Sequence, residues 1–202
     1  MEIVKYEKKG NGNYLVYLSN GTKIKLNEEV ILKYKLLYKK EIDEFLLSEI
    51  IQDNNNYDIY NKCVKYITVR LRSKKEIEEF MGRKNVSPEI IYEVIDKLTK
   101  NKLIDDEIFT KAFIADKIKF TTMGPIRISN ELEKQGINPE IINKYIYDIP
   151  EDLINEKINK QIAKIIKSTK NKTYLKNKIY TNLTNLGYSY DQIMTNLNNY
   201  EL

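Results

Sequence analysis

Apolar residues recur at helical spacing along most of the chain, and one stretch also carries clear signals for where its helices begin and end. Ile77, Phe80 and Met81 follow one another at i, i+3 and i+4, which places them on one face of a helix. Just before them, Ser73 and Glu76 have the spacing of a capping box, in which a hydroxyl and a carboxylate accept hydrogen bonds from backbone N–H groups. We therefore predict a short helix that begins after Ser73.

A tight turn and a second helix follow. Asn85 can adopt the left-handed conformation that ends a helix. Ser87 and Pro88 are typical of a helix start, with serine as the N-cap and proline in the first helical position. The apolar face of this second helix comprises Ile90, Ile91, Val94, Ile95 and Leu98. The pattern thus predicts a helix, a turn and a helix.

This pattern occurs three times, because the sequence aligns with itself after shifts of 51 residues. Ile77 then falls on Ile128 and on Ile179. The other aligned positions are apolar residues, turn residues and N-caps, namely Met81 with Leu132 and Leu183, Asn85 with Gly136 and Gly187, and Ser87 with Asn138 and Ser189. Agreement of caps, turns and apolar faces in one register indicates an internal repeat, which fixes the architecture.

Each repeat has a third, leading helix ahead of these two. Acidic residues from Asp105 to Glu107 open the second leading helix, where the helix dipole favours negative charge. The inward faces are expected to contain Ile59, Cys63, Tyr66, Ile67 and Leu71 in the first repeat, Phe109, Phe113, Ile114 and Ile118 in the second, and Leu153, Ile154, Ile158, Ile162, Ile165 and Ile166 in the third. We predict three-helix repeats at residues 53–101, 102–148 and 149–202, stacked into an elongated, mainly α array.

Residues 1–52 follow a different pattern. Alternating polar and apolar residues predict three strands, at residues 2–7, 14–18 and 22–26. Asn20 and Gly21 are a strong signal for a two-residue hairpin turn between the last two strands. The sequence therefore predicts a small three-stranded meander as a β-rich segment ahead of the repeats.

Two helical segments connect this meander to the repeats. Asn27 is expected to cap a short helix. A second helix is predicted over residues 41–51, and the amide-rich residues 52–56 are expected to break it before the first repeat begins.

Composition excludes several classes of protein. The chain has 202 residues, one cysteine, no histidine and a net charge of +5. These counts allow no intrachain disulfide or thiolate cluster, and they remove the commonest general base and metal ligand. The N-terminal residues lack the apolar run of a signal peptide, and no stretch approaches transmembrane length. We expect a cytoplasmic monomer without cofactor, metal or membrane contact.

The positive charge is concentrated in the third repeat. Between Lys157 and Lys178 the sequence has eight lysines and no acidic residue. Four of them recur along one helical face opposite the isoleucines, and the others extend the field: Lys157, Lys160, Lys164 and Lys167, then Lys170, Lys172, Lys176 and Lys178. Such a stripe could track phosphates or face an acidic protein surface. The alternative is an ordinary solvated face of a lysine-rich chain.

A second basic cluster precedes the first capped helix. It comprises Arg70, Arg72, Lys74 and Lys75. The N–H groups at the helix start, near Ser73, would add an anion site for phosphate or carboxylate. The alternative is helix-end charge on a surface loop. The remaining candidate contacts with a partner are Arg83, Lys84, Arg127 and Lys134.

Catalytic interpretations are weaker than structural ones. Asp105, Asp106 and Glu107 could form a carboxylate metal cluster, but their place at a helix start favours capping. Cys63 falls on an apolar face and the chain has no histidine to activate it, which favours a core residue over a nucleophile. We therefore predict no catalytic residues.

Three motifs resemble those of the RecX family, bacterial regulators of the RecA recombinase. Residues 70–77 read Arg-Leu-Arg-Ser-Lys-Lys-Glu-Ile, which is similar to the family's basic turn and capped helix. Residues 103–109, Leu-Ile-Asp-Asp-Glu-Ile-Phe, resemble its turn into the second repeat. Residues 124–128, Gly-Pro-Ile-Arg-Ile, with the later Glu131-Leu132 and Gly136-Ile137 pairs, are similar to its most characteristic segment.

The resemblance implies binding and no chemistry. A family member is expected to associate with the RecA–DNA filament and to modulate recombination and DNA repair, usually as an inhibitor, and some members also bind single- or double-stranded DNA. Two alternatives remain open: a helical nucleic-acid-binding protein that acts without RecA, and a magnesium-dependent nuclease built on the carboxylates at residues 105–107.

Overall fold

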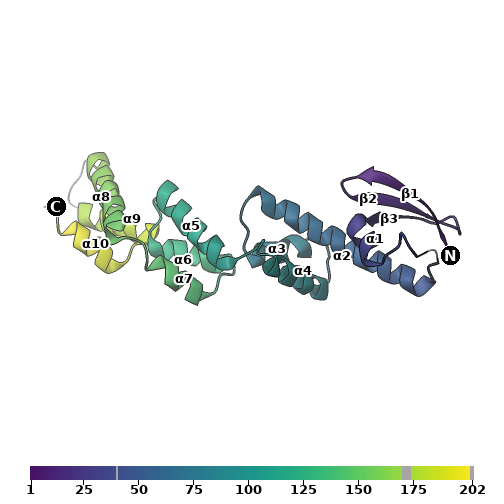
Figure 1. The fold of residues 1–202 in the computed structure, drawn as a ribbon. Helices are drawn as coiled ribbons and strands as arrows, with labels where there is room; N and C mark the ends of the chain where they lie inside the picture. The colour runs from purple at the N-terminus through teal and green to yellow at the C-terminus, as the bar shows by residue number, and fades with distance from the viewer. Residues whose placement is uncertain (40, 170–173, 201–202) are drawn as a thin grey trace. The chain divides into compact units, whose positions relative to one another are not determined.

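The computed structural model describes residues 1–39, 41–169 and 174–200. The protein is mainly helical, with a small sheet near the N-terminus (Figure 1). Strands β1 (Ile3–Gly10), β2 (Asn13–Leu18) and β3 (Lys23–Asn27) pair antiparallel in the order β1-β2-β3. The predicted fold class and the N-terminal meander are therefore confirmed.

The hairpin between β2 and β3 has the predicted turn chemistry. Gly21 has a φ of +83°, a left-handed value that glycine adopts without steric cost. The backbone N–H of Thr22 donates to Asn20 Oδ1 at 3.0 Å, which closes the turn. In the strands, Val16 pairs with Tyr6 and with Ile24 and is fully buried.

Helices α1 (Glu28–Lys33) and α2 (Glu44–Val69) follow the sheet. Asn27 caps α1 as predicted, with its side chain accepting a hydrogen bond from the Glu29 N–H. The sheet and these helices enclose an apolar core of Val16, Leu18, Leu26, Val30, Ile31, Leu36, Ile42 and Ile50.

The predicted break at residues 52–56 is wrong, because α2 continues through them. Asn54 is buried, accepting from the Asn27 N–H at 2.8 Å and donating to the Lys25 carbonyl at 3.2 Å. The carboxylate of Asp53 accepts hydrogen bonds from Lys33 and from the Tyr34 hydroxyl. These polar side chains therefore join the helix to β3 and α1 while the helix backbone stays intact.

The remaining helices form the three-helix pattern of the repeats (Figure 1). They are α3 (Lys74–Gly82) and α4 (Pro88–Lys100), then α5 (Asp106–Phe120), α6 (Pro125–Lys134) and α7 (Pro139–Ile146), and finally α8 (Glu151–Ser168), α9 (Leu175–Leu186) and α10 (Tyr190–Leu197). Helix α2 takes the leading position of the first repeat.

The register of 51 residues holds in three dimensions. The aligned apolar residues of the middle helices are all fully buried: Ile77, Ile128 and Ile179, with Met81, Leu132 and Leu183. The aligned turn residues are all left-handed, with φ values of 55° at Asn85, 77° at Gly136 and 89° at Gly187. Each turn therefore reverses the chain in the same way.

Two residues of the predicted inward faces are exposed, and the others are buried or half-buried. Leu71 is 46% exposed because α2 ends at Val69, before the helical face reaches Leu71. Leu153 is 37% exposed at the start of α8, whereas Ile154 and Ile158 of the same helix are buried. The periodic pattern identifies the face correctly and overextends it at the helix ends.

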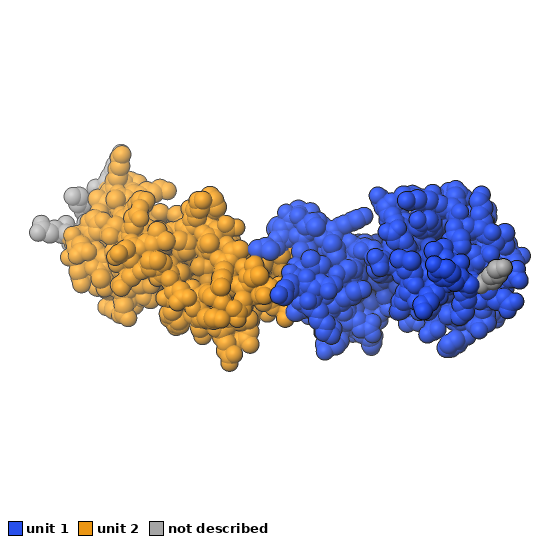
Figure 2. Space-filling view, in the orientation of Figure 1, with its two compact units in different colours: residues 1–71, 77–103 blue, residues 72–76, 104–202 orange. Residues whose placement is uncertain are grey.

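Contacts divide the chain into two compact units (Figure 2). Unit 1 contains residues 1–71 and 77–103, and unit 2 contains residues 72–76 and 104–202. The first residues of α3 thus belong to unit 2. The finer division into four parts, with boundaries after residues 52, 101 and 148, stays a prediction.

Asn54 offers a test of the unbroken helix. Replacing Asn54 by Ala leaves the Asn27 N–H and the Lys25 carbonyl without this partner, so we expect the free energy of unfolding of unit 1 to fall by about 1–3 kcal/mol. The matched control is Asn55→Ala, an exposed neighbour in the same helix. Urea unfolding followed by circular dichroism measures both variants. Equal stability of the two would contradict the structural role of the buried amide.

Candidate functional site

The predicted anion site at the start of α3 is occupied by the protein's own side chains. The Ser73 N–H donates to the Glu76 carboxylate at 3.3 Å, and the Glu76 N–H donates to the Ser73 hydroxyl oxygen at 3.2 Å, so the capping box is confirmed. The next backbone donor, the Lys74 N–H, donates to the Asp106 carboxylate at 3.0 Å. Three of the expected donors are therefore used within the protein, and the prediction that these donors are free to bind an external anion is wrong.

Side chains of this turn join α3 to the end of α6. The Ser73 hydroxyl donates to the Gln135 carbonyl at 2.8 Å, and the Lys75 ammonium donates to the Lys134 carbonyl at 2.9 Å. Both carbonyls lie at the end of α6, just before Gly136. A Cβ added to Gly136 would lie 2.8 Å from the Cβ of Lys75, so the turn approaches α3 as closely as a glycine allows.

Arg72 also has a structural role. Its guanidinium lies 3.1 Å from the Glu76 carboxylate, and the two side chains are only 11% and 13% exposed. A charge this buried is stabilised by its partner and is costly to leave unpaired. Arg72 therefore fixes the capping box and does not present its charge on the surface.

The start of α6 makes the equivalent contact with the turn after α9. The Gly124 N–H donates to the Leu186 carbonyl at 2.8 Å, and the Ile126 N–H donates to the Gly187 carbonyl at 3.0 Å. A Cβ on Gly187 would lie 2.5 Å from the backbone nitrogen of Arg127. Arg127, a predicted surface contact, thus lies against this turn, and its guanidinium donates to the Asn185 carbonyl at 3.5 Å.

The side chain of Lys157, a residue of α8, bonds the end of α5 and is not part of an exposed stripe. Its half-buried ammonium donates to the carbonyls of Ile118 and of Thr121, the latter at 2.6 Å. Burial lowers the pKa of Lys157, and the positive charge of Lys160 lowers it further. A cation at a helix C-terminus compensates the negative end of the helix dipole. Lys157 is therefore a junction residue between α8 and α5.

The other predicted basic residues are exposed: Arg70, Arg83, Lys84, Lys134, Lys160, Lys164 and Lys167. Lys160 pairs with Glu156 on the same helix, and Lys84 lies 4.9 Å from the centroid of the Phe80 ring. Exposed Lys176 and Lys178 begin α9, and Lys178 donates to the Thr169 hydroxyl at 3.0 Å. The predicted extension through Lys170 and Lys172 lies outside the described residues.

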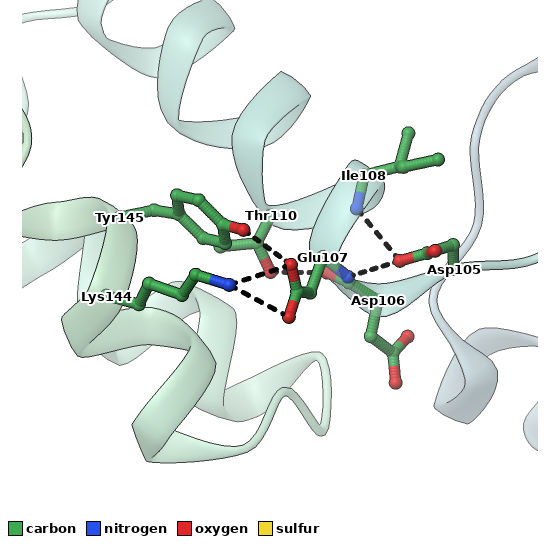
Figure 3. A network of polar contacts seen from close by, with 7 residues as sticks. All are labelled: Asp105, Asp106, Glu107, Ile108, Thr110, Lys144 and Tyr145. Carbon is green, nitrogen blue, oxygen red and sulfur yellow. Dashed lines mark hydrogen bonds and ion pairs between the residues drawn. The ribbon is translucent and has the colours of Figure 1, made fainter.

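Among the acidic residues at the start of α5, Asp105 caps the helix as predicted, whereas Glu107 pairs with side chains of α7 (Figure 3). The Asp105 carboxylate accepts from the N–H groups of Glu107 and Ile108, at 2.8 and 3.1 Å. Glu107 accepts from the Lys144 ammonium and the Tyr145 hydroxyl of α7, and these hydrogen bonds hold its pKa below the usual value. Each carboxylate in this network therefore has a structural partner.

The sequence also raised the questions of a reactive cysteine, a metal cluster and a membrane-spanning helix. Cys63 is fully buried, and burial raises the pKa of its thiol to about 11, so the thiol stays protonated at neutral pH. Among the described residues, no cluster of three or more Asp, Glu, Cys or His side chains could hold a metal ion. None of the described helices is both long and apolar enough to cross a membrane.

The sequence identifies Gly136 and Gly187 as turn residues but does not show that these turns, with Gly124, join the repeats. Gly124, Gly136 and Gly187 receive no role from composition or charge. The signal that identifies two of them is the register itself, since Gly136 and Gly187 align after 51 residues. Asp106 and Lys157 also align, and both lie at junctions.

Comparison with known proteins shows which family has this three-helix architecture. The first three-helix domain of RecX matches residues 60–98, and the second matches residues 105–146. The regulatory protein RecX of Listeria innocua serovar 6a is 29% identical over 188 residues, covering 92% of this chain and 70% of the relative. The chain belongs to the RecX family.

Solved RecX structures share its fold. A crystal structure of regulatory protein RecX superposes with a TM-score of 0.87 and 21% identity, covering 98% of both chains. RecX from Lactobacillus salivarius superposes with a TM-score of 0.68 and 26% identity, covering 73% of this chain and 97% of the other. The resemblance stated on the sequence motifs is confirmed.

The glycine turns of this RecX-family chain give a matched pair of variants. Gly187→Ala adds a Cβ against Arg127 at a left-handed position, so we expect unit 2 to lose roughly 1–3 kcal/mol of unfolding free energy. Gly82→Ala meets open space at an ordinary helical position, and we expect no loss, or a gain of up to about 1 kcal/mol. Urea unfolding separates the two, and similar losses in both would refute the close-approach argument.

Proposed function

We propose that this protein is a non-enzymatic regulator of the RecA recombinase. It binds the RecA–DNA filament in the cytoplasm as a monomer and inhibits the filament, thereby modulating recombination, DNA repair and the SOS response. The observation that carries the proposal is membership of the RecX family, with a relative named as a regulatory protein that aligns over 92% of this chain.

The chemistry of the surface supports binding over catalysis. The acidic residues that a nuclease would need have structural partners: Asp105 caps α5, and Glu107 pairs with Lys144 of α7. The exposed cations Lys164 and Lys167 on α8 offer a face that fits a nucleoprotein filament, whose phosphates and acidic side chains carry the opposite charge. Binding through such a face weakens as salt rises.

Filament binding tests the proposal directly. The purified protein should co-sediment with RecA–single-stranded DNA filaments and slow RecA-dependent ATP hydrolysis and strand exchange. Inhibition follows if the bound protein blocks filament growth or access to the second DNA. No co-sedimentation and no effect at several-fold excess over filament sites would refute it.

The cationic face can be tested apart from the fold. Lys164→Glu with Lys167→Glu reverses two exposed charges on α8, so we expect filament binding to weaken about tenfold or more at low salt. The matched control, Lys8→Glu with Lys25→Glu, makes the same change in net charge at exposed positions of the sheet. Helicity and melting temperature should stay unchanged in both. Equal binding of the two double variants would exclude α8 as a contact.

Variants of Arg72 and Arg70 distinguish a structural role from a binding role in the basic turn before α3. Arg72→Glu places a carboxylate beside Glu76 in a nearly buried position, so we expect unit 2 to lose about 3–5 kcal/mol of unfolding free energy. Arg70→Glu changes an exposed side chain and should leave the melting temperature nearly unchanged. Thermal unfolding measures both. A stable Arg72→Glu variant would restore the interpretation of Arg72 as a surface contact.

A second candidate function is nucleic-acid binding without RecA. The observation that favours it is the set of exposed lysines at the end of α8 and the start of α9, Lys164, Lys167, Lys176 and Lys178. Titration of bare DNA at several salt concentrations distinguishes the two. Tight binding with a steep salt dependence, and no effect on RecA, would favour this second function.

A further inference from the structure

Helices α3, α6 and α9 are aligned in the repeat. In α3 and α6 one face contacts a glycine turn, and in α9 the corresponding face is exposed. In the 51-residue register, Lys75 and Ile126 align with Asn177, while Arg127 aligns with Lys178. Lys75 and Arg127 both lie against a glycine turn in unit 2. Asn177 and Lys178 instead line an open groove.

This groove is shallow and open, and it follows one face of α9. It has a volume of about 480 Å³ and is lined by Tyr174, Asn177, Lys178, Thr181, Asn182 and Asn185. Apart from the tyrosine ring and the lysine stem, the lining consists of amides and a hydroxyl, which donate and accept hydrogen bonds. Such groups can bond the N–H and C=O groups of a partner's backbone.

The contacts that α3 and α6 make indicate which kind of group would bind to this face of α9. In each, the start of one helix meets the end of another helix, where the chain turns through a left-handed glycine. Lys75 donates to the Lys134 carbonyl and Arg127 to the Asn185 carbonyl, which are among the last carbonyls of their helices. These carbonyls lack partners inside their own helix and lie at the negative end of its dipole.

We propose that the groove on α9 binds the C-terminal turn of a partner's helix, closed by a glycine in the left-handed conformation. Lys178, whose ammonium also donates to the Thr169 hydroxyl, takes the position of Arg127 and donates to the last carbonyls of that helix. The amides of Asn177 and Asn182 bond the turn. The inference rests on the proposed function, which supplies the partner: a RecA subunit in the filament.

A second copy of this chain fits the groove less well. The corresponding turn in the first repeat, at residues 83–85, is exposed but ends in Asn85 with a φ of 55°. At the aligned Gly136, a Cβ would lie 2.8 Å from the Cβ of Lys75. The side chain of Asn85 therefore obstructs the close approach on which the two internal contacts depend.

A label in the groove tests the inference. Thr181→Cys introduces a reactive thiol in the groove, whereas the native Cys63 is fully buried and protonated and does not compete for the label. Asn130→Cys is the matched control, because Asn130 is exposed on α6 and aligns with Thr181. Each variant carries an environment-sensitive fluorophore, and iodide quenching reports its exposure with and without RecA–single-stranded DNA filaments.

The expected result is that saturating filaments protect the Thr181→Cys label from iodide and leave the control label exposed. Lys178→Glu should weaken co-sedimentation about tenfold, since it removes a charge-assisted hydrogen bond. Lys176→Glu, an exposed neighbour outside the groove lining, should change it much less.

Each other outcome overturns the inference in a distinguishable way. Co-sedimentation with both labels equally quenched would reject the groove and leave the proposed function intact. Absence of co-sedimentation would reject both. Protection by single-stranded DNA alone would make the groove a nucleic-acid site, and protection that grows with the protein's own concentration would indicate a second copy.

Discussion

The close approach of helix starts to glycine turns is the contact on which unit 2 depends. An isolated helix leaves its first N–H groups and its last carbonyls without partners. At Gly124 and Gly187 these two sets of groups meet, with the N–H groups at the start of α6 donating to the carbonyls at the end of α9. The approach requires a turn residue with no Cβ and a positive φ, and glycine meets both conditions.

Contacts at helix ends also account for several of the charged side chains. Asp106 and Lys157 align in the repeat but have opposite charges. Asp106 accepts from a backbone N–H at the positive end of α3, and Lys157 donates to carbonyls at the negative end of α5. Both pairings agree with the helix dipole. Charges that looked like sites for an external anion or metal ion therefore satisfy helix ends within the protein.

How far the sequence predicts the structure depends on the range of the interaction. The apolar register, the N-caps and the left-handed turns are local features, and Ile77, Asn85 and Ser189 take the places that the periodic pattern gives them. The unbroken α2 depends on Asn54 bonding to β3, a contact across 27 positions in the chain. Local propensity favours a turn at such asparagines, and tertiary hydrogen bonds override that preference.

The candidate site was harder to predict for the same reason. A lysine in a sequence carries no sign of whether its ammonium meets solvent or a carbonyl far along the chain. Lys157 and Lys164 occupy the same predicted stripe, yet Lys157 donates to the end of α5 while Lys164 is exposed. Charge periodicity alone could not separate the two.

The repeat does separate structural cations from available ones, because it shows which positions face a neighbouring helix end. Lys75 and Arg127 have such a neighbour within unit 2, whereas Lys178, at the position of Arg127, donates to the Thr169 hydroxyl and lines the α9 groove. Amide and hydroxyl groups that become buried need hydrogen-bond partners. The amides on this face of α9 therefore favour a partner that presents unpaired carbonyls, such as the end of a helix.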